Sequence, residues 1–405
     1  MIKKIVLLVF GFGVILFFYY SNTKNTPKQF QKHISLKPPI ITEDNVTLAY
    51  SKPLYKVMID REAIFACVDR NECSLLHILQ SLLGFDMNKA KYYANKYKYF
   101  PLSYDVNETL AKDLQWLSQR LKPFYDKKAQ KYYRPLLIQL SGEKRVYPYK
   151  DTLTPVLGHT RKKEKSSLTI TQGVMGLEAI KTDTKLITTI NFSLQKKLEN
   201  TIDSLQTKSK EVIAAILDLN TNEIKAIAST FRYDPNLIKR SDIPKFATHC
   251  NQYLFSSLAL LKPLIIAIEA QEKKNIQSIT PQKLLDYIDK FKLRQKNSEL
   301  PNERQMNIVK HLQEGSKIED IKLNFLQTLK LYATFYRNGR LAQPKIIKNT
   351  KTIEAPIISP TLAQKITKRN DTNQTVLLQF PDGNKTANLQ IKRDKNLFTI
   401  MLYLY

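Results

Sequence analysis

Side chains suited to catalysis or to metal binding are sparse in this sequence. Its 405 residues include 3 cysteines and 5 histidines, and neither type shows the spacing of metal ligands. There are only 10 glycines, and no glycine-rich phosphate loop is present. Such a loop needs glycine because the backbone approaches the phosphate without a Cβ in the way. We therefore expect no metal, no cofactor and no chemistry that depends on a bound nucleotide.

The charge balance is strongly basic. Lysine and arginine outnumber aspartate and glutamate 64 to 36, which gives a formal net charge of +28. Charge alone would suggest nucleic acid or an anionic membrane surface as a partner. However, the lysines are spread along the chain, and the densest run, residues 161–165, has no interleaved aromatic residues for base stacking. We expect no nucleic-acid partner and a soluble basic surface.

The N-terminus contains an uncharged apolar segment. Lys3 and Lys4 precede residues 5–20, and a helix of this length with its flanks nearly spans a hydrocarbon core of about 30 Å. A cleaved signal peptide is the competing interpretation, but no small-residue cleavage site follows the segment. We expect an uncleaved signal-anchor helix over residues 1–22, followed by a polar, lysine-rich linker over residues 23–39.

Cysteine use leaves the redox environment open. Cys67 and Cys73 are close enough in the sequence to close a small disulfide loop outside the cytosol. Cys250 is then left over, and an odd number of cysteines excludes a complete disulfide framework.

Hydrophobic periodicity predicts a mixed region up to about residue 185. Residues 40–64 alternate apolar and polar side chains, which is typical of strands. Helices are expected from Ser74, over residues 87–99 and over residues 107–121, where apolar residues recur at spacings of three and four. Residues 135–140 return to a strand pattern.

The rest of the chain predicts an α/β arrangement with a largely antiparallel sheet. We expect a strand at residues 186–191, a helix at residues 193–206 and a hairpin of two short strands within residues 212–229. A long buried helix is expected from Lys262, with Pro263 tolerated only near the first turn. The remaining predicted elements are helices at residues 280–291 and 323–336 and a final strand at residues 397–405.

Six segments occur in an order that is shared with one known family. They are residues 40–51, 145–160, 173–178, 186–195, 214–236 and 325–344. Together they resemble the class B penicillin-binding proteins of the FtsI kind, in the lysine- and tyrosine-rich form of Helicobacter and Campylobacter. The resemblance implies an α+β fold, with a mixed dimerisation or pedestal domain at residues 40–185. It also implies a truncated penicillin-binding, β-lactamase-like transpeptidase domain, an antiparallel sheet with helices, at residues 186–405.

The chemistry of that family needs a serine three residues before a lysine at the start of a buried helix. One helical turn then places the hydroxyl and the amine on the same face, and the serine forms an acyl-enzyme. Here Lys262 and Pro263 match the family, but the serine position is Ala259, and a methyl group cannot form an ester. Ser256 and Ser257 lie six and five residues before the lysine, outside the one-turn spacing.

The other two motifs of the family are also altered. Its middle Ser-x-Asn motif is absent from the expected place, where residues 297–302 are the only candidate and have the wrong order. The third motif, Lys-Thr-Gly on the strand beside the nucleophile, is interpreted as Lys385, Thr386 and Ala387, and the alanine would crowd the approach of a substrate carboxylate. Together with Ala259, these changes predict a vestigial centre and no confirmed catalytic residue.

The resemblance therefore implies a degenerate penicillin-binding protein of the cell envelope, associated with peptidoglycan synthesis and cell division as a non-catalytic scaffold. It also implies a single-pass protein of the inner (cytoplasmic) membrane with its C-terminal bulk in the periplasm. The expected partners are the inner membrane, peptidoglycan and division or elongation proteins such as a glycosyltransferase. Two alternatives stay open: an active D,D-transpeptidase with an unrecognised nucleophile, and a basic cell-wall-binding protein.

Overall fold

The computed structural model describes most of the chain after its first 35 residues. The described residues are 36–405 without 63–73, 122–123, 127–129, 166–167, 206–210, 247–249, 251–252, 296–298, 302, 305–320, 349–353, 370–372 and 381–382. Residues 36–405 form one compact unit. The predicted signal anchor, most of the predicted linker, and Cys67 and Cys73 lie outside the described residues.

The expected localisation as a single-pass inner-membrane protein is corrected by the structure. Among the described residues, no helix combines the length and the apolar character that a membrane crossing requires. The longest described helix, Leu258–Glu272, has 15 residues, which at about 1.5 Å per residue is shorter than a hydrocarbon core of about 30 Å. Its apolar side chains are used inside the protein, where Leu264 and Ile268 are 0% exposed. The segment expected to cross the membrane, residues 5–20, lies outside the described residues.

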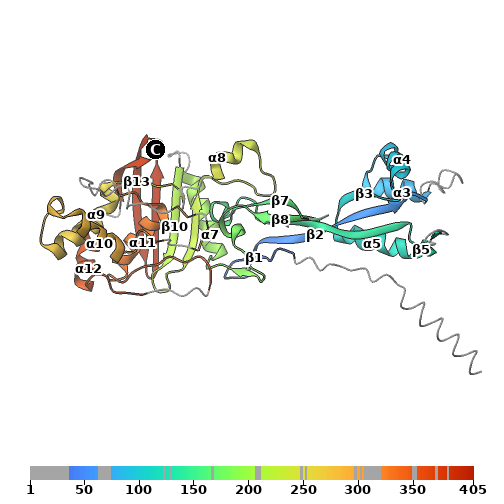
Figure 1. The fold of residues 1–405 in the computed structure, drawn as a ribbon. Helices are drawn as coiled ribbons and strands as arrows, with labels where there is room; N and C mark the ends of the chain where they lie inside the picture. The colour runs from blue at the N-terminus through green and yellow to red at the C-terminus, as the bar shows by residue number, and fades with distance from the viewer. Residues whose placement is uncertain are drawn as a thin grey trace, which may run out of the picture. The chain divides into compact units, whose positions relative to one another are not determined.

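A seven-stranded sheet organises the N-terminal part of the unit (Figure 1). Its strands are β1 (Ile40–Ile41), β2 (Thr47–Asp60), β3 (Tyr99–Val106), β6 (Leu136–Val146), β7 (Thr160–Lys165), β8 (Leu168–Gly173) and β9 (Leu186–Ile187). They follow the order β7-β8-β6-β2-β1-β9, and β3 also pairs with β2. The short strands β4 (Phe124–Asp126) and β5 (Lys131–Tyr133) form a separate antiparallel pair.

Three helices pack on this sheet, and the hydrophobic core of the N-terminal part lies between them and the strands. They are α3 (Ser74–Leu83), α4 (Met87–Lys96) and α5 (Glu108–Arg120). One cluster of buried side chains joins Leu79 of α3, Ala94 of α4 and Leu114 of α5 to Val57 and Ile138 of the central strands. The short helix α6 (Thr154–Leu157) and the 3-10 turn η1 (Gly176–Ala179) complete this part.

The C-terminal part is built on a five-stranded antiparallel sheet (Figure 1). Its strands are β10 (Glu211–Asp218), β11 (Ile224–Ser229), β12 (Asn373–Phe380), β13 (Gly383–Asp394) and β14 (Leu397–Leu404). The order is β11-β10-β14-β13-β12, so that β10 pairs with the final strand of the chain. β12 therefore forms one edge of the sheet.

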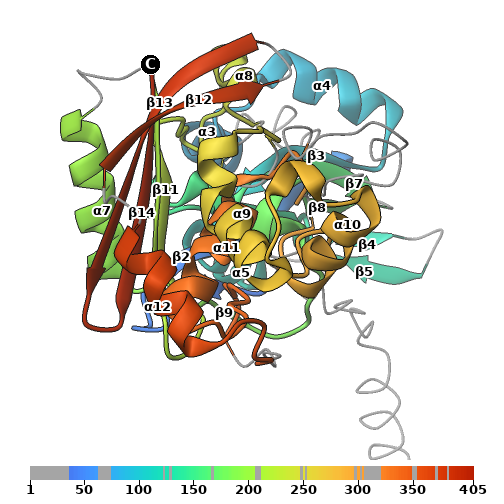
Figure 2. The ribbon, with the colours of Figure 1, turned by 90° about the vertical axis from the view of Figure 1, so that its left-hand side faces the viewer.

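Helices pack on both faces of the five-stranded sheet (Figure 2). The helical elements are α7 (Phe192–Leu205), η2 (Arg240–Asp242), α8 (Ile243–Phe246), α9 (Leu258–Glu272), η3 (Ile276–Ser278), α10 (Pro281–Lys290), α11 (Phe325–Tyr336) and α12 (Pro360–Arg369). On one face Ile202 of α7 packs against Ala214 and Ala228. On the other face Leu329 of α11 lies in the same buried cluster as Ile213. A second cluster lies among α9, α10, α11 and α12.

Most of the expected C-terminal elements are confirmed, with two changes. The predicted hairpin is β10 and β11, and the predicted final strand pairs with β10 and β13. The strand expected at residues 186–191 is only β9, and it pairs in parallel with β1 of the N-terminal sheet. The helix expected from Lys262 begins earlier, at Leu258, which places Pro263 inside the helix.

Candidate functional site

The candidate centre is the beginning of α9, where the family would carry its nucleophile. Ser257 is the N-cap residue with extended backbone, and its side chain makes no capping hydrogen bond. The helix is buried along most of its length, because Leu260 belongs to the core over the sheet and Leu261 belongs to the core among the helices. The sequence folds as a helix here because leucine and alanine favour helix and the first turn holds no β-branched residue.

Pro263 changes the hydrogen bonding of this first turn. Proline has no N–H, so the carbonyl of Ala259 lacks the donor that residue i+4 of a helix normally supplies. The hydroxyl of Tyr332 in α11 lies 3.5 Å from that carbonyl oxygen and donates to it. The helix therefore continues through the proline with a side-chain donor in place of the missing backbone donor.

One of the two groups that acylation would require is missing from this turn. Ala259 is partly buried and packs against the core over the sheet, whereas the side chain of Lys262 is exposed to solvent. The only atom that position 259 offers beyond the backbone is a methyl carbon. No hydroxyl on the helix therefore lies one turn before the amine of Lys262, where the serine and lysine route requires one.

The two serines before the helix lie outside the turn that carries Lys262. Ser256 is 2% exposed, and its neighbour Phe255 is held by two backbone hydrogen bonds with Leu323, at 2.9 and 2.8 Å. Ser257 lies outside the helical turns as the cap. The segment that leads into α9 is thus fixed in an extended conformation, and neither serine has the one-turn relation to Lys262.

The predicted third motif lies on a different strand from the one beside α9. The edge strand β12 contacts α9, whereas Lys385 and Thr386 lie on β13, the next strand into the sheet. There the backbone of Lys385 is paired with Leu378, and Ala387 is completely buried in the core. Thr386 is exposed. The structure therefore does not bring these residues beside Ala259 on a shared strand edge.

The candidate for the middle motif is only partly described. Residues 296–298 and 302 lie outside the described residues. Between them, Leu300 is buried, and the Glu299 carboxylate accepts a hydrogen bond from the backbone N–H of Ile346 at 3.0 Å. Within the described part of the chain, no group of three or more His, Cys, Asp or Glu residues is placed to hold a metal ion.

A row of buried polar side chains at the start of α11 and along it was not predicted from the sequence. Asn324, Gln327 and Lys330 are 0%, 0% and 1% exposed. The Gln327 amide donates to the carbonyl of Leu293 at 2.5 Å, and the Lys330 amine donates to the carbonyl of Lys292 at 2.8 Å. The spacing of three residues was a usable signal, because it places all three side chains on one side of a helix.

Burial changes the proton affinity of Lys330. Desolvation of the amine lowers its pKa from 10.5 to about 7, and the charge of Lys292 acts in the same direction. Glu303 opposes this effect and raises the pKa. Lys330 is therefore a lysine that can be neutral near physiological pH, although its position inside the helical core gives it no access to a substrate.

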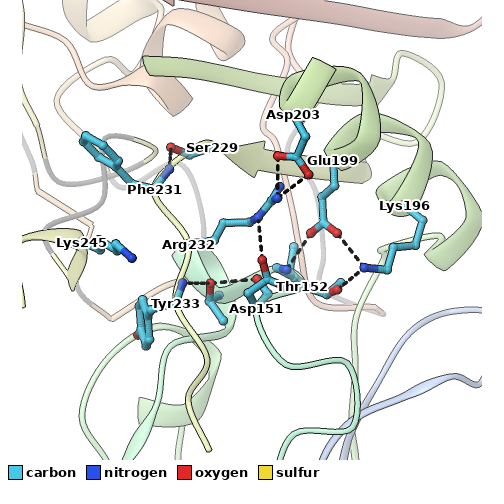
Figure 3. A network of polar contacts seen from close by, with 12 residues as sticks. Asp151, Thr152, Lys196, Glu199, Asp203, Ser229, Phe231, Arg232, Tyr233 and Lys245 are labelled. Carbon is cyan, nitrogen blue, oxygen red and sulfur yellow. Dashed lines mark hydrogen bonds and ion pairs between the residues drawn. The ribbon is translucent and has the colours of Figure 1, made fainter. Parts of the chain in front are cut away.

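A polar network holds a turn of the N-terminal part against the C-terminal part (Figure 3). Arg232 donates from one terminal nitrogen to both carboxylate oxygens of Asp203 in α7, at 2.6 and 2.7 Å, and its Nε lies 3.3 Å from Asp151. The buried carboxylate of Glu199 accepts the backbone N–H of Leu153 at 2.9 Å. Charge-assisted bonds of this kind fix geometry more strongly than neutral ones. The network therefore positions the turn.

A buried ion pair lies at the end of the linker. The Arg145 Nε and the Glu178 carboxylate are 2.8 Å apart, with side chains 2% and 0% exposed. The Lys37 amine is 3.1 Å from the same carboxylate, and the Arg145 guanidinium also donates to the carbonyls of Lys37 and Pro38. The first described residues of the chain are thereby held to the residues that close the N-terminal part.

Comparison with known proteins identifies the family that this chain resembles. Residues 271–378 match the family described as the penicillin binding protein transpeptidase domain. The matched segment begins after Lys262 and ends before Lys385, so it leaves out the first and third motif positions and includes residues 297–302, the candidate for the middle motif. The resemblance to class B penicillin-binding proteins is thus confirmed for the transpeptidase domain and for the fold. No curated protein matches the sequence.

Three solved structures show how far the fold extends. Penicillin-binding protein 2X from Streptococcus thermophilus superposes with a TM-score of 0.67 at 12% identity, covering 91% of this chain and 76% of that one. The penicillin-binding protein PBP2 of Helicobacter pylori, in a complex with MreC, gives 0.63 at 12% identity, covering 91% and 93%. A peptidoglycan synthetase from Bifidobacterium adolescentis gives 0.61 at 12% identity, covering 91% and 90%. At this identity the likeness establishes a shared fold over both parts of the chain.

Proposed function

We propose that this chain is a non-catalytic penicillin-binding-protein-like component of the machinery that synthesises the cell wall. The observation that carries the proposal is the pairing of Ala259 with Lys262 at the start of α9. The first residue offers no nucleophile, and the second exposes its amine to solvent instead of presenting it to a reacting hydroxyl. The matched transpeptidase domain supports the cell-wall setting.

The scaffold role depends on the parts that the chain retains. We propose residues 40–185 as a pedestal and residues 186–405 as a degenerate transpeptidase domain that act together as a binding partner for division or elongation proteins. The solved Helicobacter pylori neighbour is in complex with MreC, and this supports a protein of the wall-synthesis machinery as the partner class. A glycosyltransferase of the same machinery is a second partner of this class.

Labelling with a fluorescent penicillin tests the missing chemistry. The protein is incubated with the reagent beside an active penicillin-binding protein as the positive control, and labelled adducts are mapped by mass spectrometry. We expect no covalent label on this chain. We also expect no label on the variant Ala259→Ser, because Lys262 faces solvent and residues 385–387, which were interpreted as the third motif, lie on β13 and not on β12. Labelling of the unaltered protein at Ser256 or Ser257 would establish the enzyme alternative and remove the scaffold proposal.

A further inference from the structure

One face of α4 has no role in the site described above. The helix buries only Ala90 and Ala94, whose small side chains let it lie close to the core of the N-terminal part. Tyr92 and Tyr93 and the C-cap residue Tyr97 stay 55%, 40% and 55% exposed. Large aromatic side chains gathered on a surface mark a binding site more often than isolated ones do.

The exposed residues of α4 are spaced so that they share one side of the helix. Lys89, Tyr92, Tyr93 and Lys96 recur at intervals of three, one and three residues, which places them on one side of a helix. In a helix that packs on a core this pattern holds apolar residues and faces inward, but here all four side chains are exposed. We call these four residues together with Tyr97 the tyrosine–lysine face.

The rings of this face form a continuous and fixed surface. The centroids of Tyr92 and Tyr93 are 5.6 Å apart, and those of Tyr93 and Tyr97 are 6.2 Å apart. Tyr93 also lies 6.2 Å from the buried ring of Phe100, which connects the surface to the core. The Lys96 amine lies 4.3 Å from the centroid of the Tyr92 ring, in the geometry of a cation–π contact.

The charge on this face is positive. α4 contains no carboxylate, and the preceding Asp86 is occupied by capping the backbone N–H groups of Asn88 and Lys89. Within the described part of the chain, neither Lys89 nor Lys96 makes an ion pair with a carboxylate. The face therefore complements an anionic ligand.

We propose that the tyrosine–lysine face binds an anionic polysaccharide, namely the carboxylate-bearing glycan strand of the cell wall. A sugar ring has an apolar C–H face and hydroxyl groups at its edge, which match the apolar ring and polar tip of tyrosine. The stem-peptide carboxylates of such a strand match the two lysines. The choice of cell-wall glycan rests on the proposed function.

Binding of soluble muropeptide oligomers to the full chain tests this inference. Titration calorimetry is compared for the unaltered protein and for Lys89→Gln with Lys96→Gln, and for Tyr92→Ser with Tyr97→Ser. Each pair of changes is expected to weaken binding at least tenfold. The matched controls are Lys162→Gln with Lys163→Gln on β7, which remove the same charge from exposed positions, and Tyr104→Ser on β3, which removes a tyrosine that is 60% exposed. Neither control is expected to change the affinity.

Three results would overturn the inference. An equal loss in the β7 control would show attraction by overall charge alone. Equal affinity for polyglutamate, with the same sensitivity to both pairs of changes, would assign the face to an acidic polypeptide. Absence of binding by the unaltered protein would remove the site. Lys89 and Lys96 are exposed, so the lysine pair tests the site even if the tyrosine pair destabilises the fold. The penicillin labelling result is independent of all these outcomes, so the two proposals fail separately.

Discussion

Replacing Lys330 by methionine should stabilise the protein at pH 7. Burial lowers the pKa of this amine from 10.5 to about 7, and each tenfold change in proton affinity is worth about 1.4 kcal/mol. Holding Lys330 inside the folded protein at pH 7 therefore costs about 4 to 5 kcal/mol relative to a lysine in water. Methionine fills a similar volume without that cost, but it leaves the carbonyl of Lys292 without its 2.8 Å donor, which costs about 1 to 2 kcal/mol. The expected net gain is about 3 kcal/mol.

The sign of the pH dependence makes this prediction specific. The folded-state pKa lies below the unfolded-state value, so between about pH 7 and pH 10.5 the unfolded chain binds more protons at this residue. The stability of the unaltered protein therefore rises with pH across this window, by up to about 1.4 kcal/mol per pH unit, relative to the variant. The advantage of Lys330→Met should shrink as the pH rises and should disappear near pH 10.

Urea unfolding of both proteins at several pH values measures this difference. Tyrosines and other groups titrate equally in both proteins and cancel in the comparison. Lys262→Met is the matched control, because it makes the same replacement at an exposed lysine on a neighbouring helix, where the side chain is not buried. If Lys330→Met were less stable than the unaltered protein at pH 7, with a gap that does not change with pH, the amine would be charged in the fold and compensated by Glu303, and the reasoning would be refuted.

Three further changes test individual contacts by urea unfolding. Tyr332→Phe should lower the free energy of unfolding by about 1 kcal/mol, because the Ala259 carbonyl loses its side-chain donor; no change would mean that this contact contributes nothing. Glu178→Gln should cost about 3 to 5 kcal/mol, because it leaves the buried Arg145 guanidinium uncompensated, and a loss below 1 kcal/mol would contradict that account. Asn222→Gly should raise stability by about 1 kcal/mol, since this residue has φ 60° and a buried amide without a partner; a loss would show that its packing outweighs both costs.

Amphipathic helices and the hairpin could be predicted because their signals are local. The helix predicted at residues 107–121 is α5, and Leu114 on its apolar side is buried. The hairpin predicted within residues 212–229 is formed by β10 and β11, where Asn222 adopts the positive φ that the turn requires. In each case neighbouring residues determine the element, so the sequence pattern was sufficient.

The strands that were missed lack a clear alternation of apolar and polar residues. β3, β7, β8 and β12 were not predicted; β3 pairs with the distant strand β2, whereas β7 pairs with β8 and β12 pairs with β13, its neighbours in the sequence. In β3 the pattern is interrupted by Pro101, and in β7 lysine and arginine hide the strand period because an edge strand tolerates charge. The pairing of β10 with β14 joins residues 211–218 to residues 397–404, a register that no local pattern contains.

For the candidate site, predictions that rest on residue types were reliable, whereas those that rest on strand order were not. The loss of a hydroxyl at Ala259 and the burial of the helix that follows it could be read directly from residue types. The neighbourhood of Lys385 could not, because strand order decides that β12, and not β13, lies beside α9. Pro263 was expected to mark the first turn, but Tyr332 supplies a donor from another helix and allows the turn to begin earlier.

The burial of α9 offers a physical reason why this fold can be retained in a protein that lacks the nucleophile. Leu260 and Leu264 belong to two different cores that meet on this helix, and truncating a buried leucine costs about 2 to 5 kcal/mol. Stability therefore retains the buried side of α9 whether or not the protein acylates a substrate. Stability does not retain the residues that catalysis would need in the same way. Replacing an exposed lysine such as Lys262 changes the free energy of unfolding by about 0.5 kcal/mol or less. Alanine also favours helix more than serine does. Under the proposed function, an alanine in place of serine at position 259 removes the nucleophile and at the same time stabilises the first turn of α9.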